Sequence, residues 1–150
     1  IHAMLGTPND HERMVKTGHR RSINRHQWDY PSLNEVLGDP STPQAKAFDR
    51  ICKTIAVRAR QPAFHPNATQ FTLQLGDRIF GFWRQSLDRD QSIFALHNVS
   101  AETVELPVMS LNLIGHDEWH DLLSGQTISR NEKTLTLGPY QCAWITNRAR

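Results

Sequence analysis

Cationic and hydrogen-bonding side chains gather near the start of the chain, where residues 5–25 read LGTPNDHERMVKTGHRRSINR. The guanidinium groups of Arg20, Arg21 and Arg25 are planar forks of donors that suit carboxylates, phosphates and sugar hydroxyls. The stretch has no apolar periodicity, and a long irregular segment in a compact domain is usually functional. We therefore expect a binding site here, although a solvated basic loop is the alternative reading of the same residues.

Two other polar groupings could be interpreted as metal sites. Asn9, Asp10 and Glu12 could form an acid/base or calcium cluster, but Asn-Asp before a short apolar and basic run is typical of a helix cap. The run HDEWH at 116–120 spaces two histidines four residues apart, yet the zinc protease motif needs Glu directly after the first His. We expect capping at the first grouping, and we predict no metal and no cofactor.

The charge is modest and uneven along the chain. Residues 1–62 hold ten Lys and Arg against six Asp and Glu, a balance of +4, and residues 63–150 hold seven against nine, a balance of −2. This bias favours a small anionic ligand or an acidic protein face over extended nucleic acid. With no apolar run that could span a bilayer and no secretory signal, we predict a cytoplasmic protein without a membrane partner. The sequons at Asn67 and Asn98 are then chance matches.

Residues before Pro62 predict helices. Thr42 followed by Pro43 is a cap with proline at the first helical position, and the helix is expected to run to about Arg60. Its apolar residues recur at helical spacing and define one face: Phe48, Ile51, Cys52 and Ile55. A shorter helix is expected over 31–36, and the prolines after residue 60 end the long one.

After Pro62 the apolar period changes to two, which predicts strands. The alternating sets are Phe71-Leu73-Leu75, Phe80-Phe82, Val104-Leu106-Val108, Leu111-Leu113, Leu135-Leu137 and Cys142-Trp144. Turn residues punctuate these runs at short intervals, the pattern of an antiparallel sandwich of six to eight strands. The predicted domains are therefore 1–62 and 63–150.

Cysteines and tryptophans are expected to be structural. Cys52 and Cys142 have apolar neighbours and predict two buried, reduced thiols. Trp83, Trp119 and Trp144 could form a platform for sugars, but they come from separate strands or turns, which favours core packing.

Four motifs together resemble a known family: LGTPND, RSINR, WHDLLSG and LTLGPYQCAWI. The chain resembles the C-terminal part of sucrose phosphorylases and of the related glucosylglycerate and glucosylglycerol phosphorylases in the α-amylase superfamily. The resemblance implies an α+β fragment: the end of a catalytic β/α barrel followed by an antiparallel β-sandwich C-terminal domain. Residues 1–4 would end the last barrel strand, 5–30 would be the loop after it, and 43–60 the last helix. Such loops lie on the catalytic face.

The resemblance also implies an activity for the full-length protein. It would be a glycosyltransferase that cleaves an α-glucoside such as sucrose with phosphate, giving α-glucose 1-phosphate by retaining double displacement between two carboxyl groups. Those carboxylates come from earlier strands, so we expect the chain, which begins at Ile1 without an initiator methionine, to be inactive alone. The implied partners are a sugar substrate, inorganic phosphate and the rest of its own polypeptide.

One binding residue follows from the resemblance, namely Arg21, which is implied to hold hydroxyls of the glucosyl ring. His19 and Arg20 are weaker candidates for contact with phosphate or the acceptor, and Arg25 is expected to form an ion pair. The family pattern G-R-D-I-N-R has Gly and Asp where this chain has Arg20 and Ser22. That departure leaves glucosylglycerate or glucosylglycerol open as the donor. The other alternative is a noncatalytic β-sandwich module for stability or glycan binding.

Overall fold

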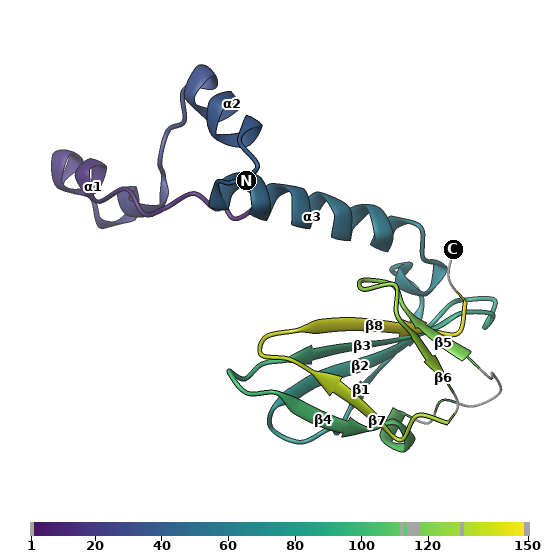
Figure 1. Ribbon diagram of the computed structural model, residues 1–150. Helices are drawn as coiled ribbons and strands as arrows, with labels where there is room; N and C mark the ends of the chain where they lie inside the picture. Colours follow the sequence, from purple (N-terminus) through teal and green to yellow (C-terminus); the bar gives the residue numbers. More distant parts are fainter. Residues whose placement is uncertain (1, 112, 114–117, 130, 149–150) are drawn as a thin grey trace. The chain divides into compact units, whose positions relative to one another are not determined.

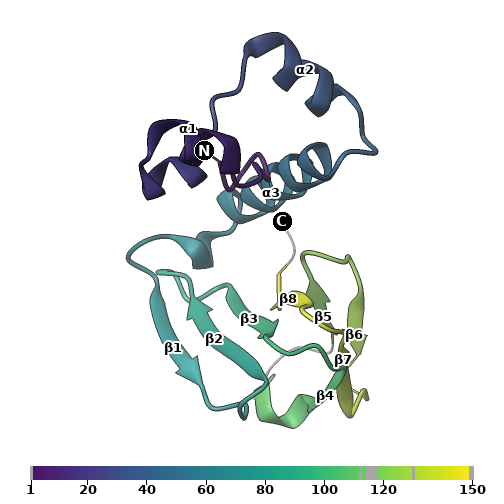
Figure 2. The ribbon, with the colours of Figure 1, turned by 90° about the vertical axis from the view of Figure 1, so that its left-hand side faces the viewer.

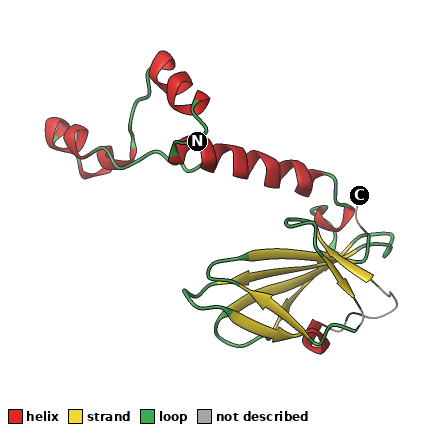
Figure 3. Ribbon diagram, viewed as in Figure 1, coloured by secondary structure: helices red, strands yellow, loops and turns green. Residues whose placement is uncertain are grey.

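The chain divides into two compact units, Ile1–Ala56 and Val57–Arg150, which are described separately below. The computed structural model (Figure 1) describes residues 2–111, 113, 118–129 and 131–148. Helices make up the first unit and strands dominate the second, as the colouring of Figure 3 shows. The predicted change of secondary structure along the chain is thus confirmed.

The first unit begins with turns and a short helix. The resemblance implies a strand end at residues 1–4, but residues 2–6 form turns closed by a hydrogen bond from the Thr7 amide to the His2 carbonyl. A strand needs a partner for its backbone groups, and among the described residues none lies beside this segment. Helix α1, His11–Thr17, then starts at Asp10 and ends at Gly18, whose φ of 68° is the left-handed conformation that glycine adopts easily.

Two further helices follow as predicted. The 3₁₀ turn η1 covers Arg20–Asn24, and α2, Tyr30–Gly38, is capped by Asp29. Helix α3 is Pro43–Ala59, and Thr42 Oγ1 accepts a hydrogen bond from the Ala45 amide at 3.2 Å. No helix in the described part of the chain is both long and apolar enough to cross a membrane.

The predicted apolar face of α3 is only partly covered. Ala45 is its one buried residue, whereas Phe48 and Ile55 are 36% and 52% exposed. Cys52 on the same face is exposed as well. The prediction of a buried Cys52 thiol is therefore wrong, because no described residue of the first unit covers this part of the helix.

All strand pairs in the second unit are antiparallel. The strands of the described residues are β1 Thr69–Leu73, β2 Ile79–Gln85, β3 Ser92–Asn98, β4 Val104–Pro107, β5 Glu118–Asp121, β6 Thr127–Ser129, β7 Thr134–Leu137 and β8 Cys142–Thr146. They form a six-stranded sheet in the order β1-β2-β3-β8-β5-β6 and a separate β4-β7 pair. Figure 2 shows β1, β2 and β3 side by side in the larger sheet. The antiparallel β fold is confirmed.

Strand β3 is the centre of the core, because both of its faces are covered. On one face Phe94 and Leu96 join a cluster with Leu106, Leu137 and Ile145. On the other face Ile93 and Ala95 pack with the 3₁₀ turn η2, Pro62–Phe64, and with Trp144. Residues 93–96 are all buried, so β3 lacks the alternation that marks a half-buried strand, and the period-two pattern did not find it.

Two details of the predicted strands need correction. Leu111 is 1% exposed and lies in the 3₁₀ turn η3, Val108–Leu111, so neither Leu111 nor Leu113 lies in the predicted strand; residue 112 is outside the described residues. Cys142 in β8 is exposed rather than buried. Successive side chains of a strand point to opposite faces of the sheet. Ala143 points to the buried face, so Cys142 points to the other face, which is open to solvent at this position.

The tryptophans pack as predicted, with one difference. Trp119 and Trp144 are buried, at 4% and 8% exposure. Trp83 is partly buried, and its ring stacks at 5.4 Å between centroids against Phe71, which is 54% exposed. The three tryptophans therefore do not form a common exposed platform.

Candidate functional site

Asp10 organises the loop that carries the candidate arginines. Its Oδ1 accepts the Arg13 amide at 2.8 Å, which caps α1 as the sequence predicted. Its Oδ2 accepts a hydrogen bond from His26 Nδ1 at 2.9 Å, sixteen residues further along. These hydrogen bonds, first that of the Arg13 amide and then that of His26, lower the pKa of Asp10 below its ordinary value. One carboxylate thus holds together the start and the end of the loop.

Further contacts close the same loop. The Asp10 amide donates to the Ile23 carbonyl at 2.6 Å, and Thr17 Oγ1 donates to Ser22 Oγ at 2.8 Å. Trp28 Nε1 donates to Thr7 Oγ1 at 3.0 Å, which joins residues 21 positions apart. We call residues 7–28, closed by these bonds, the Asp10 loop. Its backbone is ordered by long-range polar contacts rather than by a core.

The candidate ligand-binding residues all lie on one short segment of the Asp10 loop. Arg20 and Arg21 open η1, His19 is its N-cap, and all three side chains are exposed. Within the described residues no side chain forms a hydrogen bond or an ion pair with either guanidinium group. The expected ion pair of Arg25 is likewise not found among those residues. Ser22, the next residue, is buried and anchors the segment through Thr17.

The electrostatics of this segment are one-sided. Residues 16–26 read KTGHRRSINRH, with four Lys and Arg and no Asp or Glu. The Asp10 carboxylate nearby is occupied by the Arg13 amide and by His26. The two guanidinium groups therefore keep their hydrogen-bonding capacity for a ligand, and an anionic or hydroxyl-rich ligand is the kind they can bind.

Sequence reasoning missed two residues of this arrangement. His26 contacts both Asp10 and the edge of the Trp28 ring, whose centroid lies 4.8 Å from its own. Neither His26 nor Trp28 stands in a motif, and their partners are distant in sequence. The RSINR motif ends just before His26, so its position next to the motif was the available signal.

The WHDLLSG motif, in contrast, has a structural role. Asp121 is 4% exposed, and its carboxylate accepts the amides of Leu123, Ser124 and Trp144 at 2.8–3.2 Å. It also accepts the Ser124 hydroxyl at 2.6 Å. A buried carboxylate with this many donors is fully satisfied and closes the turn after β5. It is not a candidate for catalysis.

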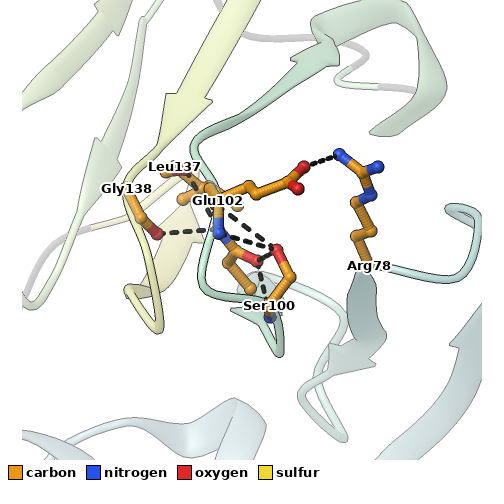
Figure 4. A network of polar contacts seen from close by, with 6 residues as sticks. Arg78, Ser100, Glu102, Leu137 and Gly138 are labelled. Atoms are coloured by element: carbon orange, nitrogen blue, oxygen red, sulfur yellow. Dashed lines mark hydrogen bonds and ion pairs between the residues drawn. The ribbon is translucent and has the colours of Figure 1, made fainter.

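Asn98 is a second buried structural group. Figure 4 labels the residues that it contacts, Ser100, Glu102, Leu137 and Gly138. Its Nδ2 donates to the carbonyls of Glu102, Leu137 and Gly138 at 2.7–3.2 Å. Its Oδ1 accepts from the amide and the hydroxyl of Ser100. Because the amide nitrogen is enclosed and used, this sequon does not present an accessible acceptor for glycosylation.

The zinc alternative at 116–120 gains no support. His116 and Asp117 lie outside the described residues, and His120 Nδ1 is 3.2 Å from Thr127 Oγ1 on the neighbouring strand. Within the residues that the structure does describe, no group of three or more His, Cys, Asp or Glu side chains could hold a metal ion.

No family model matches the chain, but it is similar to curated enzymes and to solved enzyme structures. It is 32% identical over 145 residues to a glucosylglycerate phosphorylase from Allomeiothermus silvanus, covering 97% of this chain and 23% of the relative. It is 29% identical over 154 residues to a glucosylglycerate phosphorylase from Spirochaeta thermophila, covering 97% of this chain and 26% of the relative. The chain therefore spans about a quarter of the length of these curated relatives.

Solved structures agree on the fold. An α-amylase from Geobacillus thermoleovorans, complexed with acarbose, matches 86% of this chain and 26% of its own with a TM-score of 0.63 and 17% identity. An α-glucosyl transfer enzyme, XgtA, matches 77% of this chain and 20% of its own with a TM-score of 0.55 and 16% identity. By sequence the chain is thus a relative of the glucosylglycerate phosphorylases over nearly its whole length, and it has a fold found in the α-amylase superfamily, as its motifs predicted.

Proposed function

We propose that the chain is one part of an α-glucosyl phosphorylase that uses phosphate to cleave an α-glucoside and releases α-glucose 1-phosphate. The observation that carries the proposal is the sequence similarity to glucosylglycerate phosphorylases over 97% of the chain. Glucosylglycerate is accordingly the donor we propose, in preference to sucrose. Retaining double displacement requires two carboxyl groups about 5 Å apart, which we assign to parts of the enzyme outside these 150 residues.

We assign the two predicted domains different roles. Residues 1–62 would complete the catalytic barrel, and residues 63–150 would be its C-terminal sandwich. The exposed apolar face of α3, with Phe48 and Ile55, is what a helix of such a barrel would bury against its neighbours. The Asp10 loop would then form one wall of the active site.

Within that wall, Arg21 is the residue we assign to the glucosyl subsite. Its guanidinium group is exposed and the backbone below it is fixed by Ser22, so the donors are available in a preset position. Each charged hydrogen bond to a sugar hydroxyl is worth about 1.5 to 3 kcal/mol. His19 and Arg20, on the same segment, would bind the carboxylate of the glycerate group or the attacking phosphate.

The test uses the polypeptide encoded by the complete reading frame that contains this chain. Phosphorolysis is measured with glucosylglycerate, glucosylglycerol and sucrose. Arg21→Ala should lower kcat/KM for all active donors by about 10- to 100-fold, the equivalent of one charged hydrogen bond, since the glucosyl ring is common to them. Arg21→Lys should recover part of the loss, because it keeps the charge but not the planar fork.

The Arg20→Ala variant distinguishes binding of the acceptor group from binding of the glucosyl ring. Its effect should be largest for glucosylglycerate and smallest for sucrose, whose fructosyl group is uncharged. Arg25→Ala is the matched control, an exposed arginine of the same loop that we assign to no subsite. No phosphorolysis of any of the three donors would overturn the proposed function, whereas unchanged turnover of Arg21→Ala would remove only Arg21 from the site.

A further inference from the structure

A row of three side chains crosses the six-stranded sheet from β2 to β8. Phe80 is the register partner of His97, and His97 is the register partner of Cys142. Directly opposed residues of antiparallel strands project from the same face. Phe82, two residues after Phe80, lies on that face as well. We call these three residues, Phe80, His97 and Cys142, together with Phe82 beside them, the thiol row.

The thiol row places an imidazole nitrogen against a sulfur atom. His97 Nδ1 lies 3.1 Å from Cys142 Sγ, within hydrogen-bond distance. The thiol is reduced and the residue is exposed, so an approaching molecule can reach the sulfur. A base in contact with an accessible thiol is the arrangement that activates cysteine as a nucleophile.

The aromatic side chains fix the imidazole in this position. The His97 ring stacks on Phe82, with centroids 5.9 Å apart and planes at 25°, and it also contacts Phe80 at 6.0 Å. Burial among these rings lowers the pKa of His97 below its ordinary value. The imidazole is therefore neutral at neutral pH, and Nδ1 can accept the proton of the thiol.

The chain contains a natural comparison in Cys52. That residue is also reduced and exposed, but it lies on helix α3, and within the described residues no imidazole contacts it. Both cysteines are therefore exposed, and the difference between them is that Cys142 has a neighbouring imidazole.

We propose that Cys142 is a site of reversible covalent modification by small-molecule disulfides. The Cys142 sulfur attacks one sulfur of the disulfide RS–SR while His97 accepts the thiol proton. A bond forms between Sγ and SR as the RS–SR bond breaks, and the departing RS⁻ takes the proton from His97 and leaves as RSH. Cys142 is oxidised to a mixed disulfide, one sulfur of the reagent is reduced, and a second thiol reverses the step.

The experiment measures the rate at which each thiol reacts with oxidised glutathione and with an aromatic disulfide reagent, using the complete 150-residue chain. Cys52→Ser leaves Cys142 as the single thiol, and Cys142→Ser leaves Cys52. Mass spectrometry and release of the aromatic thiol follow the reaction. Native Cys142 should react about 100-fold faster than native Cys52, the low end of what a positioned base contributes. In concentrated urea the two rates should become equal, because unfolding separates Cys142 from His97.

The role of the imidazole is tested in the Cys52→Ser background. His97→Phe keeps a ring to stack on Phe82 but removes the nitrogen, and it should eliminate most of the rate advantage. His120→Phe is the matched control, since that histidine contacts Thr127 on another part of the sheet, and it should leave the rate unchanged. Equal native rates for Cys142 and Cys52, or an undiminished rate in a folded His97→Phe variant, would overturn the proposal. Circular dichroism establishes folding, and His97→Gln replaces His97→Phe if that variant is unfolded.

Discussion

Of the 18 apolar side chains that are buried in the described residues, only Leu5 and Ala45 lie in the first unit, Ile1–Ala56. The second unit, Val57–Arg150, contains the others, and all of these except Ala68 belong to two clusters on the two faces of its large sheet. The first unit is instead ordered by helix caps and by the polar bonds of the Asp10 loop. The proposed subsite therefore lies in the unit that has almost no core.

This difference teaches where the stability of the chain resides. Burial of apolar surface is the main favourable contribution to folding, whereas each exchange of a water hydrogen bond for an internal one contributes only about 1 kcal/mol. Helix α1 has seven residues, too few to be stable without tertiary contacts. We infer that the second unit stabilises itself, and that the first gains its full order only when the exposed face of α3 is covered.

Hydrogen exchange of the intact chain should show the largest contrast between the units. Backbone amides of Phe94 and Leu96 in β3 should open only by global unfolding, which costs about 5 kcal/mol or more in ordinary domains. Amides of α1 should exchange by local opening, on the order of 1,000-fold faster relative to their intrinsic rates. Comparable protection in both units would refute the inferred difference in stability.

A second contrast lies within the sandwich, between a buried polar group and an exposed ion pair of the same network (Figure 4). Asn98→Ala removes one donor from each of three buried or half-buried carbonyls and should lower the free energy of unfolding by about 3 kcal/mol. Arg78→Ala removes only the exposed pair with Glu102 and should cost less than about 0.5 kcal/mol. Urea unfolding measures both. Similar losses for the two variants would show that Asn98 is not the centre of the network.

The sequence predicted what depends on local patterns. Thr42 and Pro43 marked the start of α3, and alternation found β1, β2, β4, β7 and most of β8. Alternation failed for β3, because this strand is buried on both faces and its apolar residues do not alternate. It also failed for Leu111, whose apolar spacing predicts a strand although the residue is buried in a 3₁₀ turn. Short strands such as β6, with three residues, offer too few positions for a period.

The residues proposed for the candidate site were identified from the sequence, but the contacts that hold their backbone in place were not. Composition and motif identified the segment of Arg20 and Arg21. The pairing of Asp10 with His26 depends on how the loop folds back on itself, and no spacing rule encodes it. For the same reason the contact of His97 with Cys142, 45 residues apart, appeared only with strand register.

The smallest expected effect concerns the Asp10 loop and its dependence on pH. Hydrogen bonds from the Arg13 amide and from His26 lower the pKa of Asp10 below its ordinary value of 3.8. A lowered pKa in the folded chain means that ionised Asp10 favours the closed loop; this contribution is complete above pH 3.8 and is lost as the pH falls through the lowered value. The NMR chemical shift of the Arg13 amide should therefore stay constant as the pH falls to about 3.8 and should change at lower pH. Asp10→Asn, which keeps a capping oxygen without the charge, should abolish this titration. A midpoint at or above 3.8 would mean that the Asp10 carboxylate is not held in the loop, and the arginine segment would then depend on the other contacts of the loop, such as that of Thr17 with Ser22.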